Sequence, residues 1–138
     1  NNIANYTIEE IEGIGPALGA KLRAAGIVST NKLLAGTKTK SQRQKIADAA
    51  GIPEKQILKF ANMADLFRVQ GVGKGFAELL EAAGVDSVPE LAQRKAENLT
   101  VKMAEVNKAR NLTRRDPYLK EVEKWVAQAK NLPRALEY

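Results

Sequence analysis

The sequence predicts an all-α protein made of two fused units of about five short helices each, which together form a compact helical bundle. Three observations support this prediction: an internal repeat, apolar residues at helical spacing, and frequent residues that begin or end helices. The sequence lacks the alternation of apolar and polar residues that is typical of half-buried strands.

The chain repeats itself after a shift of 58 residues, which aligns residues 11–35 with residues 69–93. Eight of the aligned residues are identical, and three Ile residues of the first copy align with Val. The identities are Gly13, Gly15, Leu22, Ala24, Ala25, Gly26, Ser29 and Leu33. Farther along, Phe60 aligns with Trp125 after the second copy has gained about seven residues near 107–117.

The repeat predicts a first unit over residues 1–66. Thr7 and Glu10 fit a capping box at the start of a helix. Pro16 fits the first turn of the next helix, and Gly51 follows a segment that ends like a helix. The helices of this unit are expected near residues 7–12, 16–25, 30–35, 41–50 and 53–66.

The second unit is expected over residues 67–138, and no Gly/Ser-rich linker separates it from the first. Ser87 and Glu90 fit a second capping box, and Gly84 fits a helix end. The long helix that ends the first unit is expected to supply the first helix of the second. The other helices are expected near residues 75–83, 88–95, 100–110 and 117–130.

Apolar residues three or four positions apart predict the inner faces of these helices. The three expected stripes are Leu18, Leu22 and Ala25; Ile57, Ala61 and Ala64; and Leu119, Val122, Val126 and Ala129. The Phe and Trp side chains lie on or beside such stripes and are expected in the core, whereas Tyr118 and Tyr138 are expected at the surface.

The composition excludes several kinds of chemistry. The 138 residues include no His and no Cys. The chain therefore cannot form a Cys or His zinc site, a disulfide, a Cys nucleophile or a Ser-His-Asp triad. The acidic residues are scattered over faces that are expected to be exposed. We expect a protein that is not an enzyme and that uses neither a cofactor nor a metal.

The charge balance favours polyanionic partners, because 22 Lys and Arg residues face 16 Asp and Glu residues, a net charge of +6. No apolar run approaches about 18 residues, and the first residues lack the pattern of a signal peptide. We expect a cytoplasmic protein that does not bind a membrane.

Each unit carries one Gly-apolar-Gly turn, at Gly13-Ile-Gly15 and Gly71-Val-Gly73. The glycines permit a tight turn with positive φ, the residue between them can reach the core, and the following helix presents unsatisfied N–H groups. Such a turn can bind an anion. An apolar pair before the turn, and a small residue and Leu after it, complete a pattern that resembles the helix-hairpin-helix superfamily.

The resemblance extends to larger segments. Residues 7–65 resemble the small N-terminal helical domain of archaeal and eukaryotic recombinases, and the whole chain resembles an uncharacterised microbial family with two such units in tandem. The resemblance implies two SAM-like helical units and sequence-independent contact with the DNA backbone through hairpin amides. Members of the superfamily also use these units to dock proteins, so the resemblance leaves two kinds of partner open, DNA and another protein.

The second turn is the better candidate for binding phosphate. Gly73 and Gly75 flank Lys74, and no acid lies between Asp65 and Glu78. Backbone amides around Gly73 to Gly75, together with Lys74, would then hold the anion.

The first turn is a weaker candidate. Pro16 lacks an N–H, and glutamates at positions 9, 10 and 12 surround the turn with negative charge. For Gly13 and Gly15 a purely structural role is therefore favoured over phosphate binding.

Two stretches are basic and free of acids. The segment from Gly13 to Ala47 holds seven cations, which are densest around Lys38, Lys40 and Arg43. The other stretch holds Lys108, Arg110, Arg114 and Arg115. Such residues commonly form solvated faces, and phosphate contact is the alternative interpretation.

These observations predict non-catalytic, sequence-independent binding of nucleic acid through the hairpin turns. The expected contacts are Gly13, Gly15, Lys38, Lys40, Arg43, Gly71, Gly73, Lys74 and Gly75. The alternative is a module for protein–protein interaction or scaffolding, in which the hairpins are purely structural turns.

Overall fold

The computed structural model describes residues 5–138, and every regular element within that range is a helix. The described residues divide into two compact units. The first unit comprises residues 5–65 together with residues 134–138, and the second comprises residues 66–133. The return of residues 134–138 to the first unit differs from the division expected from the repeat.

The first unit holds one 3-10 turn and four α-helices, the last of which ends just past the boundary. Helix α1 packs against the 3-10 turn and against α3, and α2 also packs on α3. The elements are η1 (Ile8–Glu10), α1 (Pro16–Ala24), α2 (Thr30–Gly36), α3 (Lys40–Ala50) and α4 (Glu54–Leu66).

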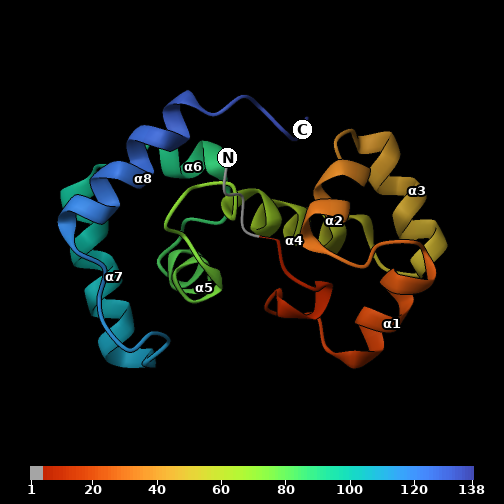
Figure 1. Cartoon of the computed structure of the whole chain (residues 1–138), viewed down its shortest axis with the longest axis horizontal. Coiled ribbons are helices and arrows are strands. Elements are labelled where there is room, and N and C mark those ends of the chain that lie inside the picture. The colour runs from red at the N-terminus through yellow and green to blue at the C-terminus, as the bar shows by residue number, and fades with distance from the viewer. Residues whose placement is uncertain (1–4) are drawn as a thin grey trace. The chain divides into compact units, whose positions relative to one another are not determined.

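The second unit holds four α-helices, with α8 packed along both α6 and α7 and with α5 packed against α7 (Figure 1). These helices are α5 (Lys74–Ala82), α6 (Val88–Ala92), α7 (Ala96–Arg110) and α8 (Leu119–Asn131). The all-α prediction is confirmed for the described residues.

Some predicted helix starts and capping boxes are wrong. The Thr7 side chain makes no capping bond, and the expected helix at 7–12 is only the 3-10 turn η1. The Ser87 hydroxyl accepts a hydrogen bond from the Glu90 amide, but the Glu90 carboxylate bonds Arg94 instead of completing the box. Helix α7 begins four residues before the predicted position of 100.

The two units share the geometry of their Gly-apolar-Gly turns, which we name the first hairpin (residues 11–17) and the second hairpin (residues 69–75). Gly13 has φ +96° and Gly71 has φ +90°, a region that residues with a side chain rarely adopt. A Cβ atom would lie 3.3 Å from the ring of Phe60 at Gly13, and 3.0 Å from Trp125 Nε1 at Gly71. The first hairpin therefore lies on the ring of Phe60 and the second on the ring of Trp125. These are the two aromatic residues that the internal alignment pairs.

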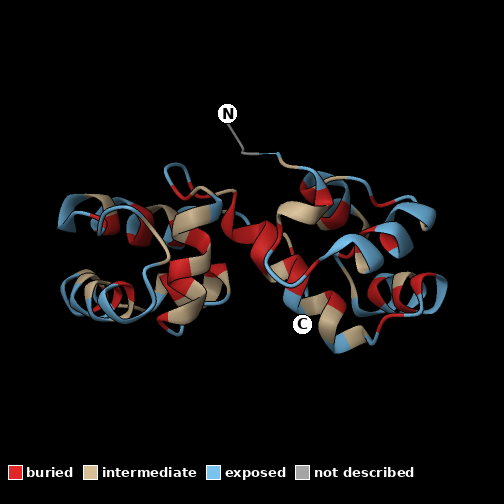
Figure 2. Ribbon diagram, turned by 90° about the horizontal axis from the view of Figure 1, so that it is seen from below, coloured by how far each residue is buried: buried red, intermediate tan, exposed pale blue. Residues whose placement is uncertain are grey.

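Most of the buried residues are apolar. Figure 2 shows where the buried residues lie along the helices of each unit. The stripe of Ile57, Ala61 and Ala64 is buried, whereas Leu119 of α8 is exposed and its predicted place in the core is wrong. The Phe60 and Trp125 side chains are buried, as predicted from the stripes.

The C-terminal segment completes the first unit. Leu136 is only 1% exposed, so it belongs to the core of that unit. The Glu137 amide donates to the Lys38 carbonyl over 2.8 Å, and the Tyr138 hydroxyl donates to Asn62 over 2.7 Å. The segment therefore docks through one apolar anchor and two hydrogen bonds.

Candidate functional site

The second hairpin leads directly into the N-terminus of α5. The Val72 amide donates to the Val69 carbonyl over 3.1 Å, which closes the turn. Gly73 is the N-cap of α5, and no side chain caps the helix there. No acid lies in the first turn of α5. Because a helix N-terminus carries partial positive charge and unsatisfied N–H groups, this end of α5 favours an anion.

A cavity of about 320 Å³ opens beside this helix end, and we name it the hairpin cavity. Its lining combines the backbone of two glycines, two arginines and the apolar residues Phe76 and Leu112. The lining residues are Gly73, Gly75, Phe76, Leu112, Thr113, Arg114 and Arg115. No carboxylate belongs to this lining, so the local charge of the wall is positive.

Residues 111–118, which we name the insertion loop, form the other wall of the hairpin cavity. This loop corresponds to the extra length of the second copy. Asn111 starts it in the left-handed conformation at φ +55°, whereas the first unit has Gly51 at the equivalent helix end. The helices α3 and α7 therefore end in the same left-handed conformation in the two units, and the extra residues of the second unit follow that point.

The buried side chain of Asn107 holds the insertion loop together. Its Oδ1 accepts from the Leu112 and Thr113 amides over 2.8 and 3.0 Å. Its Nδ2 donates to the Thr113 carbonyl over 3.2 Å and to Asp116 Oδ1 over 3.0 Å. Four bonds from one buried amide order the loop without using its arginine side chains.

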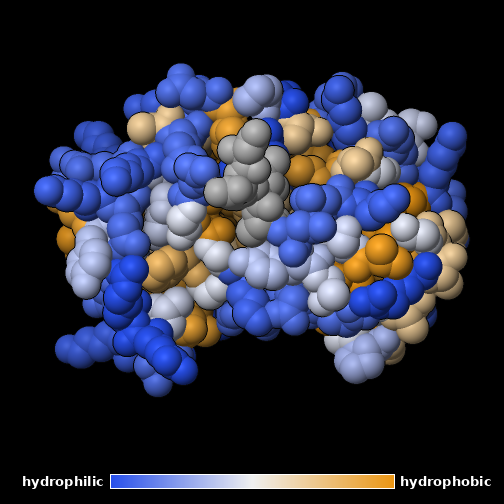
Figure 3. All heavy atoms as spheres, in the orientation of Figure 1, coloured by the Kyte–Doolittle hydropathy of each residue, from blue (hydrophilic) through white to orange (hydrophobic). Residues whose placement is uncertain are grey.

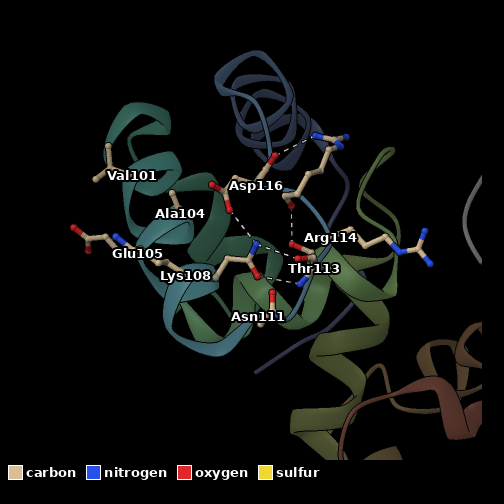
Figure 4. A pocket seen from close by; sticks show the side chains of 10 residues that line it. Val101, Ala104, Glu105, Lys108, Asn111, Thr113, Arg114 and Asp116 are labelled. Atoms are coloured by element: carbon tan, nitrogen blue, oxygen red, sulfur yellow. Dashed lines mark hydrogen bonds between the residues drawn. The ribbon is translucent and has the colours of Figure 1, made fainter.

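A larger cavity of about 620 Å³ lies between the C-terminal half of α7 and the insertion loop. Lys108 and Glu105 of α7 contribute to its lining, as do Arg114 and Asp116 of the loop. Figure 4 shows that Arg114 extends away from Asp116. In Figure 3, hydrophilic residues gather over the end of α7 and the loop that follows it.

Arg115 is paired within the protein, although its side chain is exposed. It forms two hydrogen bonds to the Glu121 carboxylate, of 2.8 and 2.9 Å, and its guanidinium lies over the rings of Phe76 and Tyr118. The hydrogen bonds from Arg115 lower the pKa of Glu121 to about 2, since they favour the ionised carboxylate. Arg115 therefore has a structural role in the wall of the hairpin cavity. Of the two arginines in that wall, Arg114 is the one that forms no ion pair with a carboxylate of residues 5–138.

The first hairpin has the same backbone and different chemistry. Pro16 occupies the first turn of α1, so one N–H is missing. Arg23 donates to both Glu9 carboxylate oxygens, over 2.8 and 2.7 Å. These bonds lower the pKa of Glu9 to about 2, so this glutamate stays charged beside α1. The arrangement is less suited to an anion than the second hairpin.

The structure corrects the prediction for Arg43. This residue is only 1% exposed, and its guanidinium donates to the Thr37 and Lys38 carbonyls and to Glu54. Because all of these bonds are internal, Arg43 orders the start of α3 and is not a surface contact. Lys38 and Lys40, by contrast, are exposed.

The predicted site residues therefore fall into two groups. Gly71, Gly73, Lys74 and Gly75 lie together around the start of α5, in the second unit. In the first unit, Gly13 and Gly15 precede α1, whereas Lys38 and Lys40 flank the start of α3.

Sequence reasoning missed the role of two residues at the second hairpin. Arg114 was visible in an acid-free stretch, but its place beside Gly73 depends on the folded loop. Asn107 carried no signal, because a lone asparagine on a helix is usually solvated.

The described part of the chain has no helix that is both long and apolar enough to cross a membrane. Within the same residues, no group of three or more Asp and Glu side chains is placed to hold a metal ion.

Neither a curated protein nor a solved structure matches the chain. A protein family does match it, over residues 12–132, which include both Gly-apolar-Gly turns, α1 to α8 and the insertion loop. The chain therefore belongs to the family described as domain of unknown function DUF4332.

Proposed function

We propose that this protein binds the DNA backbone without sequence preference and without catalysis, and that the second hairpin holds a phosphate. One observation carries the proposal. The uncapped start of α5 opens into a cavity that Arg114 also lines and from which carboxylates are absent.

The physical reasons add up at this position. Helix α5 spans nine residues, and its dipole places partial positive charge at the N-terminal amides. Gly73 and Gly75 have no side chain to keep a phosphate away from these amides. Arg114 lines the cavity and adds a full charge, and Lys74 follows Gly73 directly in the chain. Charge-assisted hydrogen bonds to phosphate are about twice as strong as neutral ones.

The resemblance to the helix-hairpin-helix superfamily supports the same assignment, since its members commonly contact DNA phosphates through hairpin amides. In this protein the first hairpin has a structural role, because Pro16 and Glu9 weaken its attraction for anions. Lys38 and Lys40 are exposed, and we expect them to contact the DNA backbone as well.

Fluorescence anisotropy with labelled duplex, branched and single-stranded DNA tests the proposal. At about 50 mM salt we expect a Kd below about 10⁻⁴ M, which rises steeply at about 200 mM salt. The logarithm of the affinity should fall by about 0.9 per neutralised phosphate on duplex DNA. Flat titrations at the lower salt would overturn the proposal and favour the protein-docking alternative.

Arg114→Gln tests the position of the site. It should lower the affinity for every sequence alike and reduce the salt slope by about 1. Lys130→Gln is the matched control, because Lys130 is an exposed cation of the same unit that lines neither cavity. Equal effects of the two variants would show that only the overall charge matters.

A further inference from the structure

Tyr118 is the last residue of the insertion loop and the N-cap of α8. The residue is 66% exposed, although its ring is large and mostly apolar. The guanidinium of Arg115 lies 4.6 Å from the ring centroid and covers part of the ring. The rest of the ring is open to solvent.

Two contacts hold Tyr118 in place. Its backbone amide donates to Glu121 Oε1 over 2.8 Å, so the Glu121 carboxylate fixes the main chain. The same carboxylate fixes Arg115, which lies against the ring. An exposed aromatic ring that is already ordered loses little conformational entropy when a ligand covers it.

This ring lies close to the hairpin cavity. The guanidinium of Arg115 also lies 5.3 Å from the centroid of Phe76, which lines that cavity beside Gly75. One guanidinium group therefore separates the ring of Tyr118 from the cavity wall. In a nucleic acid the phosphate and the base are attached to the same sugar, so a strand with its phosphate in the cavity carries its bases into this region.

We infer that Tyr118 is a stacking platform for an unpaired base, so that the protein binds single-stranded DNA more tightly than duplex DNA. The inference rests on the proposed function, which places a phosphate at the second hairpin. Aromatic side chains stack on any base, so the contact needs no particular sequence. In a duplex the bases are paired and stacked on one another, so no base is free to stack on the ring of Tyr118.

The test compares three labelled DNA molecules of equal length: single-stranded oligo-dT, a single strand of abasic sites, and a duplex. Wild-type protein should bind oligo-dT most tightly. Tyr118→Ala should weaken binding to oligo-dT by at least about fivefold, since stacking on one base contributes that much or more. The same variant should bind the abasic strand and the duplex as the wild type does, whereas Tyr118→Phe keeps the ring and should stay within about twofold on oligo-dT.

Tyr138→Ala is the matched control. Tyr138 is also exposed, at 57%, and also lies beneath an arginine, Arg134, but it belongs to the first unit. Its removal should leave the preference for oligo-dT unchanged. Circular dichroism establishes that each variant is folded.

The possible results separate the two proposals. Salt-sensitive binding in which oligo-dT, the abasic strand and the duplex are equal, with no effect of Tyr118→Ala, would overturn the stacking platform and leave backbone binding intact. A lack of binding to all three molecules would overturn both proposals.

Discussion

The two hairpins have nearly the same backbone and different surroundings. Gly15 has φ −88° and ψ −171°, and Gly73 has φ −85° and ψ −177°, so both caps are extended in the same way. The next residue is Pro16 in the first unit and Lys74 in the second. An insertion loop with Arg114 borders only the second hairpin. The two units therefore share the turn and differ in the charge of the residues at its rim.

The aromatic rings beneath the hairpins should give the largest effects. Phe60→Ala and Trp125→Ala each remove a buried ring beneath a positive-φ glycine and should lower the free energy of unfolding by about 3–5 kcal/mol. Urea unfolding followed by circular dichroism measures this loss. Under conditions where both variants are folded, only Trp125→Ala should weaken DNA binding. If both variants weakened DNA binding equally, the claim that the two hairpins differ in DNA binding would be wrong.

Asn107→Asp should give the next largest effect. The change replaces the Nδ2 donor by a second acceptor, which then faces the Thr113 carbonyl and the Asp116 carboxylate. We expect a loss of about 1–3 kcal/mol in the free energy of unfolding. Hydrogen exchange should speed up at the Leu112 and Thr113 amides, and the salt slope of DNA binding should become shallower.

Asn98→Asp is the control for this change, because Asn98 is an exposed residue of the same helix. Slow exchange at Leu112 in Asn107→Asp would contradict the role of Asn107 in ordering the loop.

Lys74→Pro converts the second hairpin toward the first. The first turn of a helix tolerates proline, so the free energy of unfolding should change by less than about 1 kcal/mol. The variant removes both an amide and a charge, and DNA binding should weaken more than in Lys74→Gln, which removes the charge alone. Equal binding by the two variants would argue against a role for the Lys74 amide.

Acid should produce the smallest effect. The pKa values of Glu9 and Glu121 are lowered from 4.5 to about 2, so both ion pairs contribute stability above pH 4.5. This contribution is lost as the pH falls from about 4.5 to about 2, because the carboxylates become protonated. Both pairs are solvent-exposed and therefore weak. Glu9→Gln and Glu121→Gln should each flatten the pH dependence of thermal stability over that range.

The sequence predicted the parts of this structure that depend on local rules. Helical spacing, glycine turns and the repeat predicted both hairpins, and the alignment paired Phe60 with Trp125. That these two rings lie beneath the hairpins is known only from the structure. Arg43 was misjudged because charged side chains are normally exposed. Arg43 lies four residues before the buried Ala47, and this spacing indicated that Arg43 is on the inner face of α3. Its partner Glu54 lies on the next helix, so the ion pair could not be predicted from local spacing.

Features that depend on distant contacts could not be predicted. The docking of Leu136 into the first unit joins segments about a hundred residues apart, and no local pattern indicates it. Leu119 fits the apolar stripe of α8 but lies at the start of the helix, where the insertion loop leads in and the stripe is still open to solvent.

The central claim is that the second hairpin, and not the first, binds phosphate. Proton–nitrogen NMR spectra of the whole chain, recorded during titration with a short single-stranded DNA, test it at the amides themselves. The Gly73 and Gly75 amides should shift and saturate together, whereas Gly13 and Gly15 should stay in place. Shifts at Gly13 and Gly15 without shifts at Gly73 and Gly75 would contradict the claim.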